Sequence, residues 1–153
     1  MAGSKELAER IRELFLDGRW IANTNYKDQI SAITWEQAIA KNHGLNTIAH
    51  LIFHVNYYMA GLIRVFEGGQ LDIHDKFSFD LPPIEGESGW NKLVSEFLFN
   101  AGQFAKLVEQ MPDGELDQPF IEEKYGSYLR NIEAVIEHGY YHLGQISLIR
   151  KLL

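Results

Sequence analysis

The chain contains no cysteine, which excludes disulfides, thiolate metal sites and cysteine nucleophiles. A transition-metal site in this protein therefore has to use histidine, aspartate or glutamate side chains. No stretch approaches the roughly 18 consecutive apolar residues of a membrane span. The N-terminal segment MAGSKELAERIRELF is charged and amphipathic, unlike the apolar core of a secretory signal. We expect a cytoplasmic protein that does not associate with membranes.

Acidic residues outnumber basic residues in this chain. Lys and Arg together number 14 against 21 Asp and Glu, which gives a formal net charge of -7. This balance argues against nucleic acid as a partner, because nucleic-acid binders present a basic face. The 153 residues are 46% hydrophobic and 23% charged, as in folded globular proteins. Length and composition predict one domain over residues 1–153.

Apolar residues recur at helical spacing in four long segments. The first starts near Leu7 and continues to about Ile30, although Gly18 weakens the pattern and favours a kink or break there. The other three span about residues 47–68, 88–112 and 127–153. Four helices of about 20 residues, each with one apolar face, predict an all-α four-helix bundle.

The connections between these segments are unequal. Thr34-x-x-Gln37 is a capping-box pattern and predicts a short extra helix in the first connection. Residues 70–87 contain the only Pro-Pro pair and little periodicity, so they are expected to form a long loop. A connection of about 20 residues between the second and third long helices is long enough for a crossover.

The six histidines are the candidate metal ligands. Four of them form two i,i+4 pairs on predicted helices, His50/His54 and His138/His142. Residues four apart lie on one helical face, about 6 Å apart along the axis, so both rings of a pair can reach one ion. His54, His138 and His142 lie on or beside apolar stripes, where a buried imidazole needs a hydrogen bond or a metal. We predict these three as ligands, with one position left open as in catalytic sites.

Ordinary packing is the competing interpretation, because a lone i,i+4 histidine pair is more often part of a core than of a metal site. Three roles stay open for His50: a fourth ligand, a hydrogen-bond partner of a ligand, or a residue at the rim of the site. His43 is expected in a solvated turn, and His74 in an exposed loop or over the site. Tyr58, one turn after His54, is the candidate catalytic proton donor. No carboxylate is an evident general base.

Two motifs carry a likeness to a known family. The segment IAHLIFH, residues 48–54, places His54 after an I-x-x-L-x-x-H pattern. The segment HGYYHLGQI, residues 138–146, has the form H-x-x-x-H-x-G-Q-I and is followed by basic residues at 150–151. With these motifs the chain resembles the DinB-like superfamily of small bacterial helical bundles. DGRWI, residues 17–21, is also similar to a Gly-Trp segment in helix one of many members.

This resemblance implies a four-helix bundle with an unusual crossover connection, and a homodimer. It implies that His54, His138 and His142 coordinate a divalent metal, commonly zinc or nickel. Members of the family include S-transferases that use low-molecular-weight thiols such as bacillithiol or mycothiol, a thiol-dependent isomerase and metal-dependent hydrolases. The implied function is a metal-dependent enzyme that activates a bound thiol or water toward a small-molecule substrate.

Two other interpretations stay open. One is a non-catalytic bundle that has a structural metal site or binds a small ligand. The other is an interaction protein that acts through its aromatic surface. Metal binding would distinguish the enzyme and the structural metal site from the interaction protein. Catalysis would distinguish the enzyme from the structural site.

Overall fold

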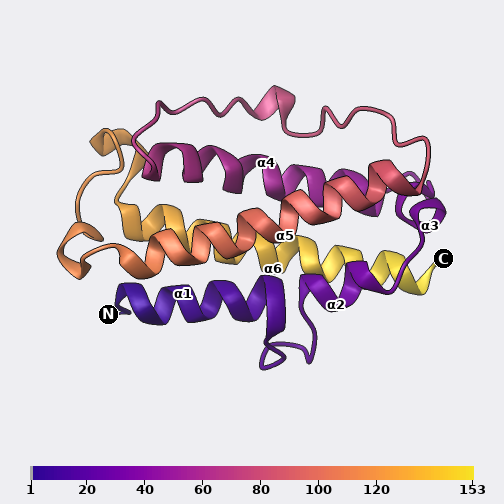
Figure 1. Cartoon of the computed structure of the whole chain (residues 1–153), viewed down its shortest axis with the longest axis horizontal. Helices are drawn as coiled ribbons and strands as arrows, with labels where there is room; N and C mark the ends of the chain where they lie inside the picture. The colour runs from indigo at the N-terminus through magenta and orange to yellow at the C-terminus, as the bar shows by residue number, and fades with distance from the viewer. Residues whose placement is uncertain (1) are drawn as a thin grey trace.

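The computed structural model describes residues 2–153 and shows an all-helical protein (Figure 1). The α-helices of the described residues are α1 (Ser4–Arg12), α2 (Tyr26–Ser31), α3 (Trp35–Ile39), α4 (Ile48–Phe66), α5 (Glu87–Gln110) and α6 (Tyr128–Lys151). Within residues 2–153 no β-strand forms, and one isolated bridge joins Pro119 to Ser127. The predicted all-α class is confirmed. In the same residues, no helix combines the length and the apolar character needed to cross a membrane.

The long helices lie side by side along the molecule (Figure 1). α1 packs against α5, α5 against α4, and α4 against α6, which also contacts α1. The connection 67–86 runs back along α4 before α5 begins, so α4 and α5 point in the same direction (Figure 1). α1 and α6 point the opposite way. The order is therefore up-down-down-up, and the long connection is a crossover, as its length allows.

The first predicted helical segment is interrupted at Gly18, where a kink or break was expected, and does not run as one helix to Ile30. α1 passes into a π-helical turn at Glu13–Asp17, the chain leaves the helix at Gly18, and α2 begins only at Tyr26. Gly18 makes this end possible because the chain folds back tightly there. A Cβ at this position would collide with the backbone and side chain of Glu13, so only glycine fits without a shift.

The loop at residues 18–25 is closed by Asn25, which is buried. Its Nδ2 donates to the carbonyl oxygen of Gly18 at 2.9 Å, and its Oδ1 accepts from the backbone N–H of Asp28 as the N-cap of α2. The DGRWI segment thus lies at the helix end and in the loop, where Trp20 is 88% exposed.

Side-chain caps and a glycine mark several of the other helix boundaries. Thr34 and Gln37 form the complete capping box of α3. Thr47 and Ser127 cap α4 and α6 through their hydroxyl oxygens. α4 ends before Gly68, whose φ of 92° is the left-handed region that favours glycine. These caps set where the two histidine-bearing helices start.

An aromatic cluster in the core fixes α6 beside the first helical segment. Phe15, Tyr26 and Phe97 pack with ring centroids 5.1 to 5.6 Å apart. The hydroxyl of Tyr26 donates to the carbonyl oxygen of Gly139 at 2.6 Å. A Cβ on Gly139 would press into Leu14, so its absence lets α6 approach the π-helical turn closely. This contact holds α6 at the residue that follows His138.

Candidate metal centre

Three histidine rings meet between α4 and α6. Nε2 of His138 lies 3.1 Å from Nε2 of His54 and 2.9 Å from Nε2 of His142. One ligand atom from each of the three lies within 4.8 Å of the other two. His54 and His142 are 7% and 6% exposed, and His138 is half-buried. The three predicted ligands are therefore close enough to bind one metal ion.

The separations fit a small divalent ion. Zinc binds histidine nitrogen at about 2.0–2.1 Å, and tetrahedral angles then place neighbouring nitrogens about 3.3 Å apart. Two Nε2 separations in the cluster, 3.1 and 2.9 Å, are within a few tenths of an ångström of that value.

Hydrogen bonds alone do not satisfy this cluster. Nδ1 of His142 donates to Oε1 of Gln145 at 2.6 Å. In the neutral ring Nε2 is then unprotonated and carries a free lone pair. Nε2 of His138 carries at most one proton, yet it faces two other Nε2 atoms. It can make one good hydrogen bond and leaves the other contact unpaired. A metal would accept all three lone pairs, so the donor set fits an ion.

His54 completes the same pattern. Its Nδ1 is buried and makes no hydrogen bond of good geometry within residues 2–153. The backbone of Ser78 opposes the lowering of the His54 pKa. A proton on Nδ1 of the neutral ring leaves the Nε2 lone pair directed into the cluster.

All three rings have lowered pKa values. Burial lowers the pKa of His138 to about 4, and the neighbouring His142 and His54 add to the effect. Burial followed by repulsion from His142 lowers the pKa of His54. Burial also lowers the pKa of His142, against the opposing effect of the hydrogen bond that the ring donates to Gln145. The rings are neutral near pH 7, which is the form that binds metal.

The crossover connection covers one side of the cluster. Phe79 stacks on the His54 ring, with centroids 3.9 Å apart and planes inclined by 7°. The hydroxyl of Tyr58 donates to Oδ1 of Asp75 at 2.8 Å, and the backbone of His74 exchanges hydrogen bonds with the Tyr57 hydroxyl at 2.8 and 3.1 Å. Two successive tyrosines of α4 thus hold the connection against the helix, beside the cluster.

Tyr58 lies next to the histidines, as its predicted role requires. Its ring centroid is 5.2 Å from that of His54 and 5.5 Å from that of His138. Burial raises its pKa, and the hydrogen bond to Asp75 raises it further against an opposing contact with Ser78. The phenol therefore keeps its proton at neutral pH and is a hydrogen-bond donor. Whether it takes part in catalysis stays a prediction.

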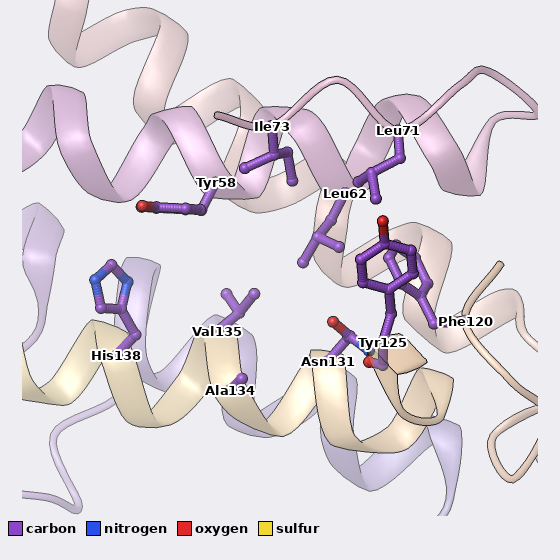
Figure 2. A pocket seen from close by; sticks show the side chains of 10 residues that line it. All are labelled: Tyr58, Leu62, Leu71, Ile73, Phe120, Tyr125, Asn131, Ala134, Val135 and His138. Carbon is purple, nitrogen blue, oxygen red and sulfur yellow. Dashed lines mark hydrogen bonds between the residues drawn. The ribbon is translucent and has the colours of Figure 1, made fainter. Parts of the chain in front are cut away.

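A cavity of about 500 Å³ opens beside the cluster, between α4 and α6. Tyr58 and His138 lie at one end, and Phe120, Tyr125 and Asn131 lie at the other (Figure 2). Between them the walls are aliphatic, from Leu62, Leu71, Ile73, Ala134 and Val135. A volume of this size and an apolar lining with few polar groups are typical of small-molecule sites.

The other histidines are not part of the cluster. Nδ1 of His50 lies 2.7 Å from the Thr47 hydroxyl at the start of α4. Nε2 of His74 lies 2.8 Å from the Asp72 carboxylate, and its side chain is 56% exposed. His43 is exposed in a turn with a φ of 50°. His50 is therefore not a fourth ligand in this arrangement, and the ring of His74 does not cover the site.

Several residues around the site had not been assigned a role from the sequence. Gln145 follows His142 by three residues, so the i,i+3 neighbour rule was a signal for their contact. Asp75 and Phe79 lie on the crossover connection, where no periodicity indicates which side chains face the helices. The same holds for Ile73 and Phe120 at the cavity, because both lie outside the long helices.

Comparisons with protein-family models, with curated proteins and with solved structures gave no match. The likeness to the DinB-like superfamily therefore rests on the motifs at residues 48–54 and 138–151. What the fold and the site define is an all-helical protein in which His54, His138 and His142 can hold a metal ion.

Proposed function

We propose that this protein is a metal-dependent enzyme of the DinB-like type that acts on a small molecule. His54, His138 and His142 would hold a divalent ion, zinc or nickel. The reaction would be transfer of a low-molecular-weight thiol to an electrophile, or hydrolysis. The observation that carries this proposal is the convergence of three Nε2 atoms at one end of an apolar cavity.

The bound ion would supply Lewis-acid chemistry, because a site of neutral ligands leaves its positive charge uncompensated and lowers the pKa of a coordinated water or thiol. The protein supplies the rest. Gln145 fixes the tautomer of His142 through the 2.6 Å contact with its Nδ1. Phe79 covers the face of His54 and keeps water from it. Tyr58 holds a proton beside the cavity and donates a hydrogen bond to Asp75.

Three protein ligands support a catalytic site over a purely structural one. Structural zinc sites are closed by four protein ligands, whereas catalytic sites keep one position for a substrate or water. Among residues 2–153, the cluster around His138 contains only the three histidines. A homodimer is also part of the proposal, and its test is the mass of the protein in solution.

Metal content is the first test. Protein purified without chelators should contain about one zinc or nickel ion per chain, and His142→Ala should lose it. His50→Ala is the matched control, because His50 occupies an i,i+4 partner position on α4 but contacts Thr47. Wild-type protein without stoichiometric metal after incubation with zinc and nickel would refute the proposal.

Activity is the second test. Metal-loaded protein should hydrolyse a 4-nitrophenyl ester, or transfer a low-molecular-weight thiol to 1-chloro-2,4-dinitrobenzene, and the metal-free protein should do neither. Tyr58→Phe removes the hydroxyl and keeps the ring, so reduced turnover with unchanged metal content would assign the hydroxyl a role in the reaction. A tightly bound ion without either activity would favour the structural metal site.

A further inference from the structure

The two ends of the cavity between α4 and α6 differ in chemistry. Figure 2 shows the rings of His138 and Tyr58 close to each other at one end. At the other end the only amide side chain of the lining, Asn131, lies below Tyr125. The wall between them is aliphatic. The cavity therefore has a polar group at each end and an apolar middle.

The amide of Asn131 presents one unused group to the cavity. Its Nδ2 donates to the backbone carbonyls of Tyr125 and Ser127, both at 2.8 Å. These two bonds use both hydrogens and fix the orientation of the amide. Within residues 2–153 no group donates to Oδ1, and this oxygen points into the cavity (Figure 2). It is a preoriented hydrogen-bond acceptor for a ligand.

The length of the cavity follows from the helix that forms its floor. Asn131 and His138 are seven residues apart on α6, which corresponds to about 10 Å at a rise of 1.5 Å per residue. An extended chain covers about 3.5 Å per three bonds. A linear chain of about nine bonds would therefore reach from Asn131 to the cluster.

The charges around the cavity restrict the ligand further. Asn131 offers an acceptor, and the hydroxyl of Tyr58 is already directed at Asp75. No Lys or Arg side chain lines the cavity, so a ligand carboxylate or phosphate at the Asn131 end would have no cationic partner and would be desolvated at a large cost. The lining selects an uncharged chain with a hydrogen-bond donor at its far end.

We propose that this cavity binds an elongated, uncharged, mostly aliphatic substrate whose terminal hydroxyl or amide N–H donates to Oδ1 of Asn131. The other end of the substrate, which carries the reacting group, would lie at His138. This placement of the reacting end rests on the proposed metal-dependent function. Binding of the chain itself needs only the cavity, so it can be measured on metal-free protein.

The test uses two probes of equal length, 1-octanol, which has a donor, and 1-methoxyheptane, which has none. Each is titrated into metal-free and zinc-loaded protein and followed by calorimetry or by amide shifts of α6. One net hydrogen bond predicts about fivefold tighter binding of 1-octanol. Asn131→Leu should reduce this affinity ratio to about one. If Asn131 had only a structural role, the substitution would instead weaken the binding of both probes equally.

A variant that fills the cavity provides the second arm. Ala134→Leu adds bulk on the cavity floor and should weaken both probes at least tenfold. Ala60→Leu is the matched control on α4, because Ala60 is half-buried and does not line the cavity. Circular dichroism shows whether each variant is folded.

The outcomes are distinct for the two proposals. The cavity assignment is supported if the probes bind to wild type and to Ala60→Leu but not to Ala134→Leu. Absence of probe binding to wild type in both metal states, or binding that Ala134→Leu leaves unchanged, overturns it. If the probes bind and neither zinc nor nickel does, the metal-dependent function fails and the apolar binding site stands.

Discussion

Gln145 is the residue on which the orientation of His142 depends most directly. Its Oε1 lies 2.6 Å from Nδ1 of a ring that is 6% exposed. A metal-bound His142 must keep its proton on Nδ1, because Nε2 is then the ligand atom. Gln145→Leu would leave this buried N–H without a partner. In the metal-free protein the His142 ring can change tautomer and so avoid an unpaired N–H. The free-energy cost of the substitution therefore applies mainly to the metal-bound state.

The expected size of the effect can be worked out. An unpaired buried donor costs about 1–3 kcal/mol, and removal of a hydrogen-bond partner of a ligand usually weakens metal affinity by about 10–100-fold. The two ranges agree, since each factor of ten is about 1.4 kcal/mol. We therefore expect the zinc Kd of Gln145→Leu to rise by about 10–100-fold. Gln145→Glu should bind zinc at least as tightly as wild type, because a carboxylate is a stronger acceptor for the N–H.

The assay is a zinc titration of metal-free protein in competition with a chromophoric chelator at pH 7.5. Gln103→Leu is the matched control, because Gln103 lies on α5 and contacts Glu67 away from the site. Its Kd should stay within about twofold of wild type, as expected for a site outside the cluster. A folded Gln145→Leu protein with wild-type zinc affinity would refute the assigned role of this contact. Equal losses in the Leu and Glu variants would do the same.

Three further predictions concern stability, each measured by urea unfolding of metal-free protein. The free energy of unfolding should fall between about pH 6.5 and 4, because the unfolded chain takes up the proton of His138 first when burial lowers its folded pKa to about 4. The half-buried ring limits this to about 2 kcal/mol, and a His138→Gln variant with the same pH dependence would contradict it. Gly61→Ala should destabilise by about 1–2 kcal/mol through collision with Ile73, but should become neutral or stabilising in an Ile73→Ala background; additive effects would show that no such collision occurs. Tyr26→Phe should cost about 1 kcal/mol by removing the bond to the Gly139 carbonyl, and an unchanged midpoint would mean that this bond adds no net stability.

Periodic patterns predicted the parts of the molecule that repeat regularly. His54 and the pair His138/His142 lie on helices whose apolar stripes set which side faces inward, so their convergence followed from helical spacing. The sequence indicated a kink or break at Gly18, but not the tight turn that forms there, which depends on the close contact with Glu13. Side-chain spacing carries no information on how closely the backbone folds back.

The crossover connection was the least predictable part of the site. Asp75 and Phe79 contact α4 through a hydrogen bond and a ring stack, but neither belongs to a periodic pattern. Their positions depend on tyrosine hydroxyls of α4 and on the absence of a side chain at Gly61, against which Ile73 packs. Such contacts between an irregular segment and a helix are properties of the tertiary structure.

The unequal spacing of the three ligands along the chain bears on how the protein should be refolded. His138 and His142 are one turn apart, whereas His54 is separated from His138 by 84 positions. A newly formed α6 therefore offers two ligands before α4 has docked. Metal that binds this half-site in incompletely folded chains reduces the stabilisation gained from binding the native state. Refolding in a chelator, with metal added after the bundle has closed, should give the higher yield of correctly assembled sites.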